Sequence, residues 1–269
     1  TPDNGLAVVV TARNEHPPAL ALATEIASRA WEDRASFKKT LTSLEQARAI
    51  AEQSNDRHNQ PVLFSDAGDN PGGGGSGNTT ALLQALLVSD ANDVLFGSLF
   101  DADLASRAHA LGVGAHFEAK LNRHSSYEHA QKINLPATVI ALGDGQVTGR
   151  RGIYANRALD LGPTCALRLG DRGNVTLVVT SRRIQTADPV FFEQFSFDIG
   201  TYSTVCVKSR GHFRAGFDLW FSPEQIFEID TPGLTAPVLS RFEWKGLPRP
   251  SYPLDDDTDW TAPLSSKPQ

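Results

Sequence analysis

Residues 61–87 read PVLFSDAGDNPGGGGSGNTTALLQALL, and this stretch decides the fold. Its first five residues, 61–65, form a short apolar run that is typical of a buried strand, and residues 81–87 have the apolar spacing of a helix. Between them lies a polar turn that contains four consecutive glycines, at 72–75. A strand, a Gly-rich turn and a helix in this order indicate an α/β fold.

The turn carries the residue types of a ligand-binding site. Glycine lets the backbone approach a ligand closely and adopt positive φ at no steric cost. The start of a helix leaves free N–H groups that suit an anion or a polarised carbonyl. Asp66 lies on the same turn, and we predict that its neighbours bind a polar ligand: Asp69, Asn70, Gly72, Gly73 and Gly74. A flexible loop without a ligand is the alternative interpretation.

Two nucleotide-binding motifs overlap the turn, and both depart from their patterns. Residues 72–79 spell G-x-x-x-x-G-N-T, a phosphate loop in which Asn78 replaces the lysine that reaches the outer phosphates. Residues 72–77 also spell the dinucleotide fingerprint G-x-G-x-x-G, with Asp101 or Asp103 as the ribose-binding acid. In that fingerprint the first glycine follows the strand directly, whereas six residues intervene here. Nucleotide hydrolysis is disfavoured, and a dinucleotide oxidoreductase stays an alternative.

The composition argues against several classes of function. The chain has 269 residues, a net charge of −6 and 40% hydrophobic residues. These values suit one large or two modest globular domains and disfavour nucleic acid or an anionic membrane as a partner. No apolar run is long enough to cross a bilayer, and no signal peptide is visible. Cys165 and Cys206 lie in apolar runs, so we predict buried free thiols and a cytoplasmic protein.

The spacing of apolar residues predicts the other elements of the chain. Helices are expected at about residues 18–34, 43–53, 101–111 and 188–195. Strands are expected at 6–10, 93–99, 137–142, 146–149, 165–169, 175–180 and 204–207, with 113–121 extended and 122–132 a surface loop. This pattern predicts an α/β fold with a mixed sheet, flanking helices and a second half that is richer in strands. Because the chain has no methionine and opens almost at once on the predicted strand at 6–10, we expect it to be part of something longer.

Two further polar clusters follow predicted strands. Ligands bind at the carboxyl ends of strands in open α/β sheets, where cations can hold a carboxylate or stabilise an oxyanion. We therefore predict substrate-binding side chains after the strand at 204–207, namely Lys208, Ser209, Arg210 and Phe213, and after the strand at 175–180, namely Ser181, Arg182 and Arg183. The two clusters are expected to be neighbours, and solvated basic turns are the alternative.

His212 is the residue that best fits a catalytic role in proton transfer, because histidine titrates near neutrality. The other closely spaced histidines do not form a metal-binding pattern. His124 and His129 lack a third ligand, and His109 and His116 form no helical pair with an acid. We interpret these four as surface histidines, and no residue of the chain is predicted to bind a metal.

Several motifs, taken in order, resemble the C-terminal domain of the microcystinase C (MlrC) family of metallopeptidases. The resemblance spans about residues 6–255 and is carried by residues 61–74, 77–80, 161–164, 178–185, 208–217, 229–233 and 247–255. It implies that 1–60 is the tail end of the family's N-terminal region and that 61–255 is the C-terminal α/β domain. Residues 256–269 are expected to be a disordered tail. Specificity is expected to vary at 122–132 and 150–157.

The resemblance also implies an activity. It points to a zinc-dependent amidohydrolase or peptidase that acts on small, linearised microcystin-type peptides. The zinc ligands of the family lie in an N-terminal domain that is mostly outside this chain, so the chain alone is expected to be inactive. The expected partners are a small peptide or amide substrate and that metal domain, with the oligomeric state left open. A non-catalytic module for a carboxylate-bearing ligand is the alternative function.

Overall fold

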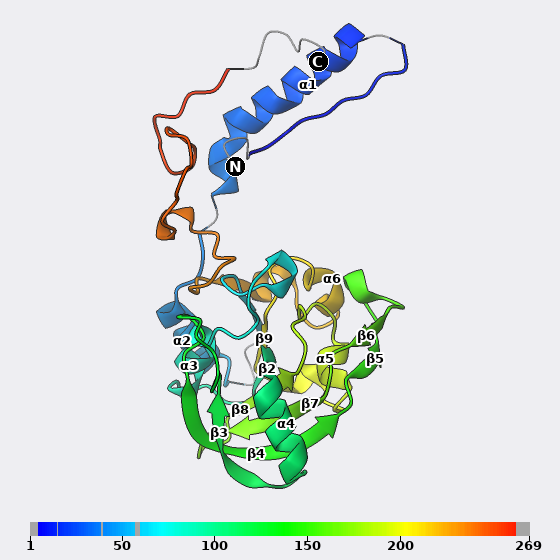
Figure 1. The fold of residues 1–269 in the computed structure, drawn as a ribbon, viewed down its shortest axis with the longest axis vertical. Helices are drawn as coiled ribbons and strands as arrows, with labels where there is room; N and C mark the ends of the chain where they lie inside the picture. The colour runs from blue at the N-terminus through cyan, green and yellow to red at the C-terminus, as the bar shows by residue number, and fades with distance from the viewer. Residues whose placement is uncertain (1–4, 15, 39, 57–59, 262–269) are drawn as a thin grey trace. The chain divides into compact units, whose positions relative to one another are not determined.

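The computed structural model describes residues 5–14, 16–38, 40–56 and 60–261 (Figure 1). The chain divides into two compact units, one made of Thr1–Thr40 with Val238–Gln269 and the other of Leu41–Pro237. The domain boundaries that the resemblance implies stay predictions, and residues 262–269 of the expected disordered tail lie outside the described residues.

The larger unit is built on an eight-stranded mixed sheet, in the order β10-β1-β9-β2-β8-β7-β4-β3. The strands from one edge to the middle are parallel, namely β10 (Ile226–Ile229), β1 (Val62–Asp66), β9 (Thr204–Val207), β2 (Val94–Phe100) and β8 (Val175–Thr180). The sheet continues antiparallel through β7 (Thr164–Leu169), β4 (Ile133–Gly143) and β3 (His116–Leu121). A separate small sheet pairs β5 (Gln146–Thr148) with β6 (Ala158–Asp160).

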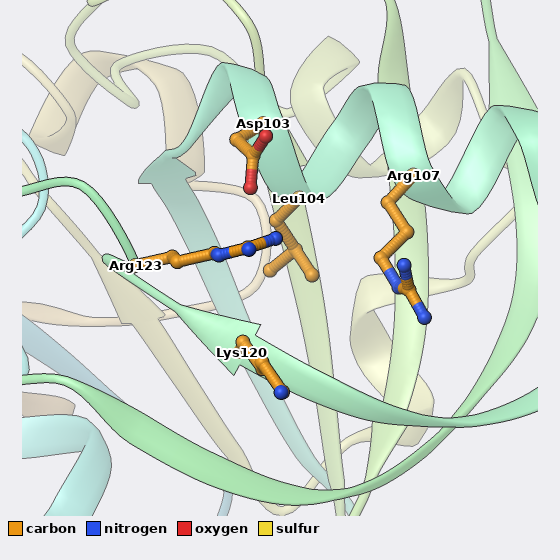
Figure 2. A pocket seen from close by; sticks show the side chains of 5 residues that line it. All are labelled: Asp103, Leu104, Arg107, Lys120 and Arg123. Atoms are coloured by element: carbon orange, nitrogen blue, oxygen red, sulfur yellow. The ribbon is translucent and has the colours of Figure 1, made fainter.

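Helices cover both faces of the large sheet because successive strand side chains point to opposite sides. Phe64 and Phe96 pack with α2 (Leu44–Gln53), α3 (Ala81–Leu87) and α4 (Ala102–Leu111) on one face. Their neighbours Leu63 and Leu95 pack on the other face with α5 (Val190–Glu193) and α6 (Arg214–Phe217). A small pocket lies between α4 and the end of β3 (Figure 2).

Most elements expected from the sequence are present. The α/β class and the mixed sheet are confirmed, and the strand at 204–207 has the predicted bounds. Helix α2 starts after Ser43, whose hydroxyl accepts a hydrogen bond from the Gln46 amide (3.1 Å) in a capping box. Both cysteines are buried and free. None of the described helices combines the length and hydrophobicity that a bilayer-spanning segment requires.

The predicted strand at residues 6–10 is wrong. These residues form no regular structure, and Val9 is 85% exposed. A run of β-branched residues favours a strand only where a neighbour takes its backbone hydrogen bonds, and none of the described residues pairs with this run. The helix expected at 188–195 is shorter, because Asp188 accepts the Val190 amide (2.9 Å) ahead of α5. Strands β6 and β10 and helix α6 were not predicted.

The smaller unit contains α1 (His16–Glu32), in which no residue is buried. Its aromatic residues form a cluster in which Trp31 contacts Tyr252 and Trp260, with ring centroids 5.9 Å and 6.2 Å apart. The guanidinium of Arg34 lies 4.4 Å from the Trp31 ring centroid, a cation–π contact. Among the described residues, this unit therefore holds together through surface aromatic contacts rather than a buried core.

Candidate functional site

The three polar clusters converge at one edge of the sheet. They follow β1, β8 and β9, which are parallel, so their carboxyl ends lie at the same edge. Arg183 donates to the Gly75 carbonyl (3.4 Å), which joins the second cluster to the Gly-rich turn. Gln185 donates to the Ser209 hydroxyl (2.7 Å) and lies 3.1 Å from His212 Nδ1. The expected proximity of the clusters after β8 and β9 is confirmed.

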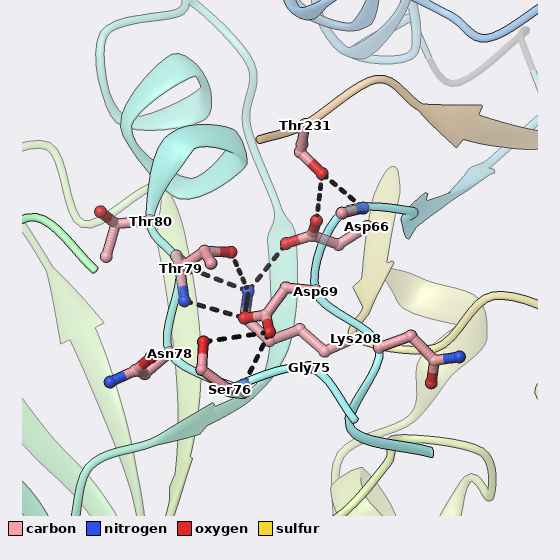
Figure 3. Close-up of polar contacts among 12 residues, drawn as sticks. Asp66, Asp69, Gly75, Ser76, Asn78, Thr79, Thr80, Lys208 and Thr231 are labelled. Atoms are coloured by element: carbon pink, nitrogen blue, oxygen red, sulfur yellow. Dashed lines mark hydrogen bonds and ion pairs between the residues drawn. The ribbon is translucent and has the colours of Figure 1, made fainter. Parts of the chain in front are cut away.

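Beneath this edge lies a buried ion-pair network centred on Lys208 (Figure 3). The ammonium group donates to Asp66 Oδ2 (2.7 Å), Asp69 Oδ2 (2.9 Å) and the Thr79 carbonyl (2.8 Å). The Lys208 side chain is fully buried. An ammonium group has three protons to donate, and all three have acceptors here.

Asp69 accepts hydrogen bonds from three residues at the end of the Gly-rich turn. Its Oδ1 accepts the Gly77 amide (2.7 Å) and the Ser76 hydroxyl (3.3 Å), and its Oδ2 accepts the Thr79 amide (2.8 Å). These contacts satisfy backbone donors that would otherwise be buried without partners. The conformation of the turn therefore depends on one carboxylate.

Asp66 links the same network to the loop that follows β10. The hydroxyl of Thr231 donates to Asp66 and accepts the Gly68 amide (2.8 Å). Nearby, the Thr235 hydroxyl accepts the Asn70 amide (2.9 Å). Four chain segments, after β1, before α3, after β9 and after β10, are thus connected through one set of buried polar contacts.

The three charged groups have different electrostatic environments. Burial raises the pKa of the Asp66 carboxyl, and the Lys208 charge only partly offsets this effect. Burial also opposes ionisation of Asp69, but the Lys208 charge and the Gly77 and Thr79 amides outweigh it and hold its pKa below the usual range. Burial disfavours charged Lys208, yet the two carboxylates prevail and raise its pKa. The network therefore contains a protonated lysine and an ionised Asp69 at neutral pH.

The predicted site residues fall into a buried and an accessible group. Asp69, Lys208, Ser209 and Phe213 are fully buried. The exposed residues are Gly72, Gly73, Gly74, Arg182, Arg183 and His212, while Asn70, Ser181 and Arg210 are half-buried. The first group shapes the edge from below, whereas the second can reach a ligand.

The accessible side chains differ in how firmly they are held. Arg182 pairs with Asp160 (2.8 Å) and Arg210 lies 3.8 Å from Glu228. Asn70 accepts the Gly72 amide through its side chain (3.1 Å), and the Ser181 hydroxyl donates to the Pro163 carbonyl. Both contacts between His212 and Gln185 involve Nδ1. His212 Nε2 has no partner among the described residues. This nitrogen is available to exchange a proton with a ligand.

Sequence reasoning missed two residues of this arrangement. Gln185 is 3% exposed and joins the clusters after β8 and β9, and Thr231 is buried under Asp66. Both lie in motifs that carry the family resemblance, at 178–185 and 229–233. The resemblance includes these positions but assigns no role to either residue. Gln185 follows Arg182, Arg183 and Ile184 at the end of the same polar segment, and this position is the signal that could have identified the first.

The backbone of the turn is accessible because side chains are absent from it. A Cβ built on Gly72 would lie 1.7 Å from Gln185 Oε1, so this glycine allows Gln185 to reach His212 and Ser209. Gly74 has φ +97° with open space around it, a conformation that suits glycine. The 72–74 segment therefore presents a bare backbone at the edge.

The described residues do not fit a metal ion. No group of three or more His, Cys, Asp or Glu side chains converges in this part of the chain in a way that could hold one. The buried carboxylates of the edge, Asp66 and Asp69, are both engaged by Lys208. A cation at their position would have to displace the ammonium group.

Residues 64–246 match the family described as the MlrC C-terminus. The chain belongs to this family. Microcystinase C from Sphingomonas sp. is 25% identical over 214 residues, which cover 79% of this chain and 40% of that protein. A crystal structure from Mesorhizobium sp. BNC1, of a protein provisionally named a metallopeptidase, superposes with a TM-score of 0.74 at 24% identity. The superposition covers 90% of this chain and 47% of the Mesorhizobium chain, and this likeness shows a shared fold.

The MlrC C-terminal chain spans less than half the length of these two proteins. The matched range contains all three polar clusters and the Lys208 network.

Proposed function

We propose that residues 41–237 form the substrate-binding part of a metal-dependent peptidase, with the carboxyl edge of the parallel strands as the binding surface. The observation that carries this proposal is the convergence of the Gly-rich turn, the 181–185 segment and the 208–213 segment at that edge. The exposed guanidinium groups of the 181–185 segment, the free Nε2 of His212 and the exposed 72–74 backbone lie at this edge. These groups complement the carboxylates and carbonyls of a short peptide.

The buried and accessible groups have separate roles in this proposal. Arg183 binds a peptide carboxylate or carbonyl beside the exposed 72–74 backbone, and His212 Nε2 exchanges a proton with the substrate. The amides of 72–74 donate within the turn and hold its shape. Lys208 and Asp69 are positioning residues, because both are buried and their polar atoms are already satisfied. No residue of this edge is assigned to a metal.

We place the metal ligands, and the zinc that the family resemblance implies, in a region of the protein outside this chain. Support comes from the relatives, which are more than twice as long as the part that this chain matches. By this proposal the 269-residue chain alone binds substrate without cleaving it, and linearised microcystin-type peptides are the substrate class to test.

Substitution of His212 by alanine in the complete, metal-loaded protein is expected to lower kcat/KM for a small linear peptide about 100-fold, the usual effect of losing one proton-transfer group. Substitution of Arg183 by alanine is expected to raise KM about tenfold with kcat nearly unchanged, because it removes a ground-state contact. Steady-state kinetics of peptide cleavage measure both parameters.

His116 provides a matched control for His212. It is exposed, and its Nδ1 is held by the Thr138 hydroxyl (2.8 Å), but it lies on β3 away from the clusters. The His116→Ala variant should retain kcat/KM within about twofold of the wild type. Equal losses in both histidine variants would contradict the assignment of His212.

The alternative function is a non-catalytic module that holds a carboxylate-bearing ligand. The same cations favour it, and the described residues contain no group of three or more His, Cys, Asp or Glu side chains that could hold a metal. Under this alternative the complete protein binds the peptide but does not cleave it at any metal concentration. Under the peptidase proposal, cleavage is lost on metal removal and restored by zinc.

A further inference from the structure

A second, separate polar site lies between α4 and the end of β3. The pocket has a volume of about 50 Å³ and is lined by Asp103, Leu104, Arg107, Lys120 and Arg123. Figure 2 shows Asp103, Leu104 and Arg107 on the helix, Lys120 on the strand and Arg123 on the residues after it. No part of this pocket belongs to the three polar clusters described above.

The charge of the pocket is opposite to that of the chain. Three of its five lining residues are cations, whereas the chain as a whole carries a net charge of −6. Arg107, Lys120 and Arg123 form no ion pair or side-chain hydrogen bond with any described residue. Asp103, the one acid, lies 3.7 Å from His124 Nε2 instead. Three cations and one acid give the pocket an excess of positive charge, and a bound anion would offset that excess.

The two walls of the pocket are fixed relative to each other by Asp101. Its Oδ1 accepts the Leu104 amide (3.0 Å) at the start of α4, and its Oδ2 accepts the Asn122 amide (2.7 Å) directly before Arg123. Asp101 is 8% exposed, and these bonds are shielded from water. The helix wall and the strand wall are thus joined at one end, so the backbones that carry the three cations are held in place before any ligand arrives.

We propose that this pocket binds one anionic group of a small ligand, a phosphate or a carboxylate. A cavity needs about 10–15 Å³ by this measure to hold one water, so a pocket of about 50 Å³ has room for a few waters or for one small anionic group. Arginine forks match both carboxylate and phosphate oxygens, and lysine adds a point charge. This site does not rest on the proposed peptidase function.

The test is a titration of the 269-residue chain with inorganic phosphate and, separately, with acetate, at constant ionic strength maintained with chloride. Isothermal calorimetry or amide chemical shifts report binding. We expect saturable amide shifts at 103–107 and 120–123 with a Kd of about 1–10 mM, the weak affinity of a fragment-sized ligand. Tighter phosphate binding identifies a phosphorylated ligand, and tighter acetate binding a carboxylate ligand.

The variants Arg123→Met and Lys120→Met are each expected to weaken the preferred anion about tenfold, the effect of losing one charge-assisted hydrogen bond. Both side chains are exposed, so thermal unfolding should show that the variants stay folded. Arg48→Met, on the exposed face of α2, is the matched control and should leave the affinity unchanged. The proposal is overturned if neither anion saturates a site, or if all three variants bind like the wild type.

Discussion

The Lys208→Met variant is expected to unfold with a free energy about 3–5 kcal/mol lower than that of the wild type, the usual cost of breaking a buried ion pair on one side. The substitution leaves Asp66 and Asp69 buried without their cation, and it removes the donor to the Thr79 carbonyl. Urea unfolding followed by circular dichroism measures the change. Lys132→Met, at an exposed lysine, is the control and should change stability by less than about 0.5 kcal/mol.

The pH dependence of this loss follows from the shifted pKa values. In the wild type the lowered pKa of Asp69 contributes stability above the unfolded-state pKa, and that contribution is lost as the pH falls. The raised pKa of Lys208 contributes stability below its unfolded-state pKa and is lost at strongly alkaline pH. Without Lys208 the carboxylates must take up protons to remain buried. The deficit of the Lys208→Met variant should therefore be smaller at pH 4 than at pH 8. A variant within about 1 kcal/mol of the wild type at both pH values would contradict the central role of the network.

The Gly75→Ala variant is expected to lose about 2–3 kcal/mol of stability, as overpacking against a fixed neighbour does. A Cβ on Gly75 would lie 2.7 Å from the Asn70 nitrogen and 2.9 Å from the Asn70 carbonyl carbon and oxygen, and backbone atoms cannot rotate away. The same change displaces the Gly75 carbonyl that accepts Arg183, so peptide affinity should fall about tenfold when the charge-assisted contact of Arg183 is lost.

Gly211→Ala is the matched control for this prediction. Gly211 lies at the same sheet edge, but a Cβ there would meet no atom within 4 Å and its φ is not positive. This variant should keep both stability and affinity, within about 0.5 kcal/mol. If Gly75→Ala behaved like Gly211→Ala, the turn would be a flexible loop rather than a built site.

The sequence predicted the position of the site better than the roles of its residues. Strand ends, glycine spacing and apolar periodicity are local features, and they placed all three clusters at the carboxyl edge. The pairing of Lys208 with Asp69 joins residues 139 positions apart, and no local pattern reveals it. The sequence therefore predicts Asp69 and Lys208 as ligand contacts. Both are fully buried and their polar atoms are hydrogen-bonded within the protein, so we propose that they position the turn.

The elements that were missed have a related physical reason. Strand β10 is short, and it exists because β1 accepts it in parallel register at the sheet edge. Residues 6–10 form no strand, although their apolar composition is typical of one, because no described residue pairs with them. In both cases a distant hydrogen-bonding neighbour, rather than local propensity, decides the outcome.

The central claim is that the carboxyl edge of β1, β8 and β9 binds a short peptide through its carboxylate and carbonyl groups. Amide chemical shifts of the 269-residue chain, recorded while a linear peptide with a free carboxylate is added, test it most directly. We predict saturable shifts at 72–77, 181–185 and 209–213, and weaker shifts with the C-terminally amidated peptide. Shifts confined to other parts of the larger unit, or none at 72–77, would contradict the account.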